Sequence, residues 1–214
     1  RNHSSAASDV YKRQGLNFST TEINIKNKIM TITLDRPEKK NAMNNVMMNE
    51  INYLLAYAKQ EKDIRVVVFA ANGDIFCAGA DLSRTESKSN VPRLENSDDI
   101  SLSLRHLYKP VICKIQGPVL AGALLIVSNA THAIAVDEAT FSAPEIHRGL
   151  WPFMVMAGLF RVMPKRAGLD FIMRGKPIDS QKAMKWGLIN ESVKKDELDK
   201  KVDKLADELA SLAP

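Results

Sequence analysis

Residues 109–122 read KPVICKIQGPVLAG, and this stretch carries the clearest evidence for the fold class. Val111–Ile115 (VICKI) is a short apolar run of the kind that forms a strand buried on both faces of a parallel sheet. It passes through Gly117 and Pro118 into small residues that begin a helix at residues 120–125. A buried strand that leads directly into a helix is the building unit of an α/β protein.

The same alternation of strands and helices extends in both directions from this stretch. A hairpin is expected at residues 23–34, with a polar turn at residues 26–28. Asn44 or Asn45 can cap the helix that follows, which has one apolar face and is expected to end near Lys62. Extended segments are expected at residues 64–70, 132–136 and 188–193, and helices at residues 102–108, 153–163, 165–174, 180–186 and 196–212. We therefore predict the α/β class.

Composition and charge are those of an ordinary globular protein, with 45% hydrophobic and 26% charged residues. The formal net charge of +5 is too small to indicate nucleic-acid binding, although it would suit a small ligand with several negative charges. Cys77 and Cys113 lack metal-ligand spacing and are expected to be free thiols in a reducing compartment. No apolar run approaches the roughly 18 residues of a membrane helix. We expect a cytoplasmic protein that binds no metal, nucleic acid or membrane.

Three regions are expected along the chain. Residues 1–14 (RNHSSAASDVYKRQ) are polar and serine-rich, so they cannot offset the entropy that is lost on ordering. We predict a disordered appended tail over residues 1–19 and a core domain over residues 20–195. Within the core, the weakly patterned residues 83–99 are expected to form a mobile loop. Residues 196–214 begin a C-terminal helical region.

Two turns of small residues follow predicted strands and are suited to hold a ligand. They are residues 77–81 (CAGAD) and residues 117–123 (GPVLAGA). Small side chains leave backbone N–H groups open to a ligand, and the first amides of a helix are unsatisfied and carry the positive end of its dipole. Two such turns that converge on one point would form an oxyanion hole. From the residues alone, the small side chains of each turn are explained at least as well by tight packing between a strand and a helix as by ligand binding.

Glu145 is the clearest candidate for a proton-transfer group. It follows a predicted strand and the turn at Pro144, next to the apolar residues Ile146, Leu150 and Trp151. Apolar surroundings raise the pKa of a carboxyl group toward the working range of an acid/base catalyst. A carboxylate at a helix N-terminus, favoured by the helix dipole, is the alternative reading of the same position.

Five motifs occur in a specific order and spacing: NAM at 41–43, FCAGADL at 76–82, KPVICKIQGPVLAG at 109–122, FSAPEIHRGL at 141–150 and AMKWGLIN at 183–190. Together they resemble the enoyl-CoA hydratase/isomerase (crotonase) superfamily, from about residue 23 to residue 214. The resemblance implies a crotonase-like spiral of β-β-α units with helices packed around the sheets, and a homotrimer or hexamer. Similar proteins continue with further helices after the one that ends near residue 212, so we expect either a truncated sequence or a family member that lacks those helices.

The resemblance implies catalytic roles for three residues. The backbone N–H groups of Ala80 and Gly122 would bind the carbonyl oxygen of a thioester and the enolate formed from it. Glu145 matches the second of the two glutamates of typical hydratases and would carry protons. The position of the first glutamate holds Leu125 here, so the two-carboxylate pattern of a hydratase is not complete.

Binding of coenzyme A is implied at four residues. Ala78 matches the position whose backbone contacts the adenine, while Lys39 and Lys40 match, more loosely, the basic side chains around the CoA phosphates. Asp81 belongs to the same loop and is expected to cap or brace it.

The acyl pocket is expected to include Leu125, Trp151 and Phe153. Bulky residues after Glu145 replace the glycine-rich stretch of hydratases, which suggests a drier pocket or plain core packing. Ala121 and Ala123 replace glycines that flank the hole, and alanine narrows the permitted backbone angles.

The expected function is enolate-stabilising chemistry on a coenzyme A thioester, without a prosthetic group. Hydration of a 2-enoyl-CoA is the first expectation. Isomerisation of a 3-enoyl-CoA to a 2-enoyl-CoA is the second, because Glu145 alone suffices for it. A catalytically weak acyl-CoA-binding or assembly subunit is the non-enzymatic alternative.

Overall fold

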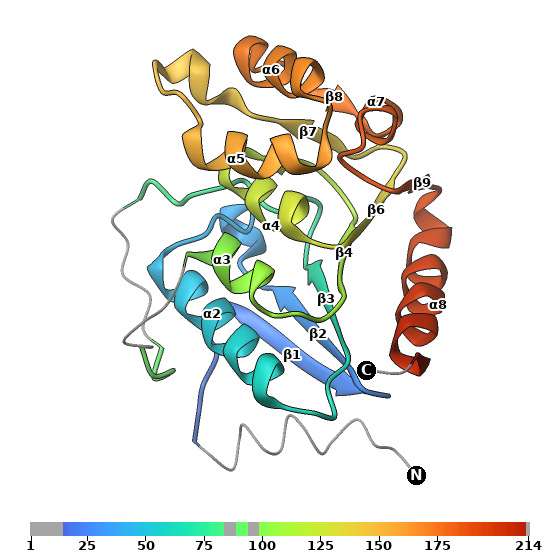
Figure 1. Cartoon of the computed structure of the whole chain (residues 1–214). Coiled ribbons are helices and arrows are strands. Elements are labelled where there is room, and N and C mark those ends of the chain that lie inside the picture. Colours follow the sequence, from blue (N-terminus) through green and yellow to red (C-terminus); the bar gives the residue numbers. More distant parts are fainter. Residues whose placement is uncertain (1–14, 84–88, 94–98, 213–214) are drawn as a thin grey trace.

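The computed structural model of the chain describes residues 15–83, 89–93 and 99–212 as two sheets with surrounding helices (Figure 1). The strands are β1 (Thr21–Lys26), β2 (Ile29–Leu34), β3 (Val66–Ala71), β4 (Val111–Ile115), β5 (Val119–Leu120), β6 (His132–Val136), β7 (Thr140–Ser142), β8 (Ile178–Asp179) and β9 (Glu191–Val193). The α-helices are α2 (Asn45–Gln60), α3 (Ile100–Arg105), α4 (Leu124–Asn129), α5 (Phe153–Val162), α6 (Lys165–Arg174), α7 (Ser180–Lys185) and α8 (Leu198–Ser211). Short 3-10 helices are η1 (Pro37–Lys39), η2 (Ala121–Ala123), η3 (Pro144–Arg148) and η4 (Lys195–Glu197).

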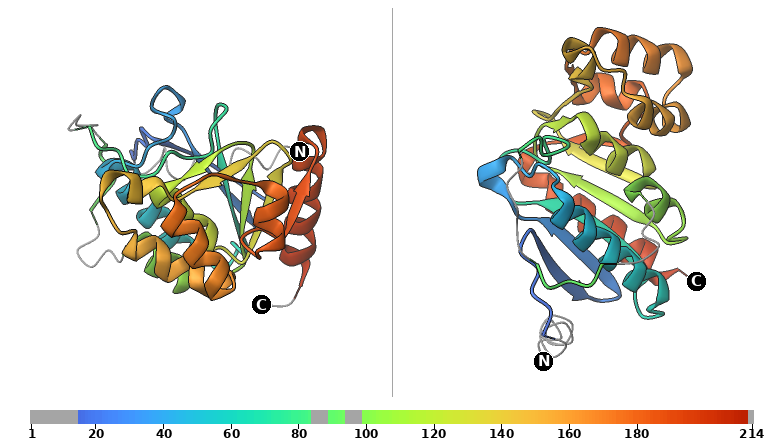
Figure 2. Two further views of the ribbon diagram at one scale, coloured as in Figure 1. Left: turned by 90° about the horizontal axis from the view of Figure 1, so that it is seen from above. Right: turned by 90° about the vertical axis from the view of Figure 1, so that its left-hand side faces the viewer.

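The larger sheet has the strand order β1-β2-β3-β4-β6-β9. Strands β1 and β2 pair antiparallel as a hairpin, and the later pairings in this sheet are parallel. Helix α2, with α3 packed against it, covers one face, and α8 covers the other (Figures 1 and 2). Because both faces are covered, the central strands are apolar, and residues 66–70 of β3 are all buried.

Helix α2 is fixed at both ends by side chains. The side-chain oxygen of Asn44 accepts a hydrogen bond from Met47 N at 2.9 Å, which satisfies one of the free amides of the first turn. At the other end, the ammonium group of Lys109 donates to carbonyl oxygens around the last turn. These are the carbonyl oxygens of Ala58, Glu61 and Ile64. Burial lowers the pKa of Lys109, and the nearby Glu61 partly offsets this.

The smaller sheet has the strand order β5-β7-β8 and carries the turns that matter for function. Strand β5 follows β4 through Gly117, where an added Cβ atom would lie 2.0 Å from Asp74 O, so only glycine fits. Strands β5 and β7 pair in parallel, and Cys77 forms a parallel bridge with Val119 in β5. The segment after β3 therefore runs alongside β5, which in turn pairs with β7.

Glu50 on α2 is fully buried and ties the start of β1 to the helix. Its carboxylate accepts hydrogen bonds from Ser19 N at 2.8 Å, from Thr20 N at 3.1 Å and from the hydroxyl groups of Ser19, Thr20 and Thr21. A buried carboxylate needs such donors, and here they come from the chain just before and at the start of β1. Ser19, which the sequence assigns to the tail, is thereby fixed to the core. Residues 1–14 of the predicted tail lie outside the described residues.

The two cysteines are buried free thiols. Burial raises the pKa of Cys77 to about 12 and raises the pKa of Cys113 as well, so neither thiol is a nucleophile near neutral pH. Across residues 15–83, 89–93 and 99–212, no helix is long and apolar enough to span a membrane. The same ranges contain no group of three or more His, Cys, Asp or Glu side chains arranged to hold a metal ion.

The α/β class is confirmed, and most predicted elements lie within a few residues of their expected bounds. The helix expected at residues 102–108 spans Ile100–Arg105 instead. The carboxylate of Asp99 caps two amides of its first turn, and Tyr108 adopts a left-handed φ of +56° that a helix cannot accommodate. The loop predicted at residues 83–99 lies largely outside the described residues.

Replacing Glu50 by alanine is expected to lower the free energy of unfolding by about 3 kcal/mol, because buried donors at residues 19–21 lose their acceptor. Urea denaturation followed by circular dichroism measures the change. Glu208→Ala, at an exposed position on α8, is the matched control and should stay within about 0.5 kcal/mol of the parent. Equal stability of the two variants would contradict the anchoring role of Glu50.

Candidate active site

Three parallel chain segments finish side by side at the same end of the smaller sheet. Cys77 bridges β5, where Leu120 N donates to Cys77 O at 3.0 Å, and β5 pairs in parallel with β7. Adjacent parallel segments bring their C-terminal ends to the same edge of a sheet. The residues that follow, 78–81, 121–123 and 143–145, therefore emerge at one place.

The turns at Gly79–Ala80 and Ala121–Gly122 are in contact. A Cβ atom added to Gly122 would lie 3.6 Å from Ala80 N, and one added to Gly79 would lie 3.0 Å from Gly122 N. The amide nitrogens of Ala80 and Gly122 therefore flank one small space. Ala80 is exposed, so this space is open to solvent.

The hydrogen bonds around Ala80 leave its own amide unused. Met43 N donates to Gly79 O at 2.7 Å, and Asp81 N donates to Met43 O at 2.9 Å. In the described part of the chain, Ala80 N donates to no backbone acceptor. Gly122 lies in the first turn of η2, where a helix provides no acceptor for its amides. Two unsatisfied donors beside one space are the requirement for an oxyanion hole.

Ala121 holds the second donor in a strained conformation. Its φ of +51° is left-handed, which costs an alanine roughly 1 kcal/mol more than a glycine. Backbone strain of this kind concentrates at functional sites, because the surrounding structure enforces it. An alanine at this position is therefore accommodated at a cost.

Glu145 lies in the first turn of η3, directly after β7. Its Oε2 atom is buried and has no hydrogen-bond partner within the ranges that the structure describes. Burial raises the pKa of Glu145 above the ordinary value of 4.5, while its own backbone amide and Arg148 act in the opposite direction. Desolvation thus outweighs the helix N-terminus, and the group is suited to exchange a proton with a ligand.

The residues predicted to bind coenzyme A lie on two neighbouring loops, one between β2 and α2 and the other after β3. Ala78 N donates to Lys40 O at 3.0 Å, which brings Ala78 next to the exposed residues Lys39 and Lys40. Among the described residues, no backbone N–H donates to the carbonyl oxygen of Ala78. The carboxylate of Asp81 instead pairs with Arg36 at 2.9 Å and accepts a hydrogen bond from Ser83 N. It braces the loop, as the sequence indicates.

The residues predicted to form the acyl pocket differ in exposure. Leu125, in the first turn of α4, and Trp151, before α5, are half-buried and pack against the core. Phe153 begins α5 with 69% of its surface exposed, so it is not part of the core. Helix α5 packs on α4 and on η2, the short helix that contains Gly122.

Two supporting residues were missed by the sequence analysis. Arg36 binds Asp81 and the carbonyl oxygen of Ala42. Asn41 donates to two carbonyl oxygens in the loop between β3 and Cys77, at 2.8 and 2.9 Å. Both belong to the stretch around the NAM motif, which marks the region but does not reveal that these polar side chains are buried.

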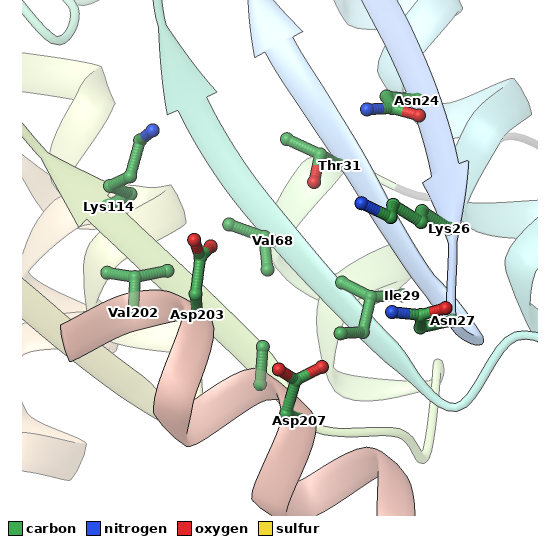
Figure 3. A pocket seen from close by; sticks show the side chains of 11 residues that line it. Asn24, Lys26, Asn27, Ile29, Thr31, Val68, Lys114, Val202, Asp203 and Asp207 are labelled. Atoms are coloured by element: carbon green, nitrogen blue, oxygen red, sulfur yellow. The ribbon is translucent and has the colours of Figure 1, made fainter. Parts of the chain in front are cut away.

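Two surface hollows formed by described residues lie away from these turns. Figure 3 shows one of about 310 Å³ between α8 and strands β1–β3, lined mostly by polar side chains such as those of Lys26, Asp203 and Asp207. A hollow of about 560 Å³ lies at the end of α4 opposite the hole, near Arg105 and Arg161. Neither combines free amides with a desolvated acid, so we place the candidate active site at the turns.

A family model described as "Enoyl-CoA hydratase/isomerase" matches residues 24–214. The chain belongs to the enoyl-CoA hydratase/isomerase family. The resemblance identified from the five sequence motifs is thereby confirmed, and the matched range includes both turns and Glu145.

Several members of the enoyl-CoA hydratase/isomerase family are similar to the chain along most of its length. Human enoyl-CoA hydratase domain-containing protein 3, described as mitochondrial, is 28% identical over 86% of this chain and 62% of its own length. Mevalonyl-coenzyme A hydratase of Aspergillus fumigatus is 29% identical over 79% of this chain and 64% of its own. A probable enoyl-CoA hydratase of Mycobacterium bovis is 30% identical over 79% of this chain and 64% of its own length. The chain thus spans less than two thirds of the length of these curated relatives.

Solved structures of the enoyl-CoA hydratase/isomerase family share the fold. An enoyl-CoA hydratase/isomerase from Mycobacterium paratuberculosis superposes with a TM-score of 0.82 at 27% identity, over 92% of this chain and 79% of that one. A carnitinyl-CoA dehydratase from Mycobacterium avium 104 gives a TM-score of 0.81 at 28% identity, over 91% of this chain and 78% of that one. The predicted crotonase-like fold is confirmed.

Gly79→Ala is expected to destabilise this family member by more than about 1 kcal/mol, because φ is +88° and the new methyl group would lie 2.8 Å from Ala121 Cβ. Thermal unfolding measures the effect. Gly149→Ala is the matched control, since φ is +70° there and an added Cβ meets no atom within 4 Å. If both substitutions cost the same, the close contact between the two turns does not constrain the site.

Proposed function

We propose that the protein is an acyl-CoA enzyme that stabilises a thioester enolate and hydrates a 2-enoyl-CoA. The observation that carries the proposal is the pair of unsatisfied amides, Ala80 N and Gly122 N, beside one space. The strand that leads to Glu145 pairs with the strand that leads to Gly122. Relatives named as hydratases of enoyl-CoA and mevalonyl-CoA support hydration as the first choice.

The amides would act on the thioester carbonyl oxygen. When water adds to Cβ of the 2-enoyl group, negative charge moves to that oxygen, where two oriented N–H groups stabilise it. Glu145, in its protonated form, would deliver a proton to Cα, and the proton released by the added water would restore the acid. The buried Oε2 atom of Glu145 supports this role, because no protein group competes for it among the described residues.

Isomerisation is a second candidate, favoured by Leu125. An apolar, half-buried side chain stands where a two-carboxylate hydratase has its first glutamate, which removes one means of orienting water. In a 3-enoyl-CoA isomerase, ionised Glu145 would take a proton from Cα and return it at Cγ. The amides of the hole would stabilise the same enolate, and no water would be needed.

The wider properties of the molecule are part of the same proposal. The substrate would arrive as a coenzyme A thioester, and no prosthetic group would be required. The exposed ammonium groups of Lys39 and Lys40 would meet the CoA phosphates, and the carbonyl of Ala78 would meet the adenine. We propose a homotrimer or hexamer in the cytoplasm, although the similar animal proteins are described as mitochondrial.

Glu145→Gln is expected to reduce turnover of crotonyl-CoA or of a 3-enoyl-CoA by about 10²–10⁴-fold, because the amide cannot transfer the proton. Steady-state assays with both substrates measure the loss and identify the reaction. Glu138→Gln makes the same chemical change at an exposed position and should leave turnover unchanged. Turnover that survives Glu145→Gln would refute the assigned proton carrier. Binding of CoA esters without turnover of either substrate would favour the binding-subunit alternative.

The pH dependence of kcat/KM is expected to distinguish the two reactions. Burial raises the pKa of Glu145, so the change in kcat/KM that reports its titration should lie above pH 4.5. This change should be absent from the pH profile of Glu145→Gln. A hydratase that uses the protonated acid should lose activity as pH rises through that pKa. An isomerase that uses the carboxylate should lose activity as pH falls through it. A profile that is identical in the parent and Glu145→Gln would exclude both roles.

A further inference from the structure

We infer that Arg36 is a positioning residue of the oxyanion hole, because its guanidinium group joins the two segments that hold Ala80 and neutralises the carboxylate beside it. The inference rests on the proposed function, since it concerns the same two amides. It assigns a role in the reaction to a residue that lies outside the hole itself.

The contacts of Arg36 lie on both sides of the turn that contains Ala80. Ala80 forms a parallel bridge with Met43. Arg36 Nη1 donates to the carbonyl oxygen of Ala42, one residue before Met43, and to Asp81 Oδ2 at 2.9 Å, one residue after Ala80. A single nitrogen atom therefore links the two strands of the bridge and fixes the direction of the Ala80 amide.

The ion pair also controls charge next to the hole. The side chains of Arg36 and Asp81 are each only 7% exposed, so water screens the pair weakly. Hydrogen bonds from Ser83, followed by Arg36, lower the pKa of Asp81 to about 2, and its carboxylate is ionised at neutral pH. An unpaired carboxylate one residue from Ala80 N would repel the developing oxyanion. The guanidinium group cancels that charge.

The backbone between Arg36 and Met43 depends on side-chain contacts for its shape. Lys40 and Asn41 are consecutive non-glycine residues with φ of +54° and +53°. Such strain persists only where neighbouring groups enforce it. Arg36 N donates to the side chain of Asn41 at 2.8 Å, and this bond uses the backbone, so it is retained when the side chain of residue 36 is changed.

Arg36→Gln and Asp81→Asn, singly and together, test the inference by infrared spectroscopy of bound butyryl-CoA labelled with ¹³C at the thioester carbonyl. Butyryl-CoA has no double bond, so it can be neither hydrated nor isomerised. Hydrogen bonds from the hole should lower the carbonyl stretching frequency relative to free butyryl-CoA. Lys201→Gln is the matched control, because it breaks the Lys201–Glu191 ion pair between α8 and β9, away from the hole.

In Arg36→Gln we expect most of the carbonyl frequency shift of bound butyryl-CoA to be lost. With the preferred enoyl-CoA, kcat should fall by about 10–100-fold while KM changes little. Adding Asp81→Asn should recover kcat by about fivefold or more over Arg36→Gln alone, because the unpaired charge is removed. Lys201→Gln should keep the full shift and the parental kcat. The frequency shift and kcat of each variant are expressed per folded site. Circular dichroism gives the folded fraction, and titration with butyryl-CoA gives the concentration of binding sites.

A full frequency shift and full kcat per folded site in Arg36→Gln would overturn the positioning role alone. A double variant no faster than Arg36→Gln would overturn the charge-neutralising part. Absence of a shift in the parent protein would instead refute the proposed function, and the inference with it.

Discussion

The close approach of Gly79 to the Ala121–Gly122 turn is the constraint on which the candidate active site depends. Neither turn uses its central amide in a sheet or helix, so the two N–H groups meet only because the turns touch. The pairing of β5 with β7 and the bridge at Cys77 bring the segments together. The smaller sheet is short, but the register of its strands determines where the amides of Ala80 and Gly122 lie.

The fold was predictable from the sequence because its larger elements have strong periodic signals. The apolar run in β3 and the amphipathic face of α8 are examples, and both elements lie close to their predicted ranges. The short strands β5, β7 and β8 were not predicted as strands, since two or three residues are too few to show a period of two. Their pairing depends on contacts between distant segments.

The site was predictable only in part, and for a comparable reason. Small-residue turns and Glu145 can be read from the sequence, and the family resemblance joins them into one proposal. The buried ion pair of Arg36 with Asp81 could not be read, because the two residues are 45 positions apart and charged residues are ordinarily exposed. The desolvation of Glu145 was anticipated from its apolar neighbours. The left-handed φ of Ala121 could not be predicted from the sequence, because it depends on the contacts of the folded chain.

The two donors of the hole belong to the main chain, so their chemical identity is independent of the side chains at residues 80 and 122. The surroundings nevertheless differ. Ala80 faces solvent, whereas a Cβ atom on Gly122 would enter the space next to Ala80 N. The side chain of residue 80 can therefore vary at the rim of the site. A side chain at residue 122 would meet the protein only at ordinary contact distances of 3.6 Å or more, but it would stand in the space that a ligand oxygen needs. The side chain at one donor can change without filling the space between the two amides, whereas any side chain at the other donor would narrow it.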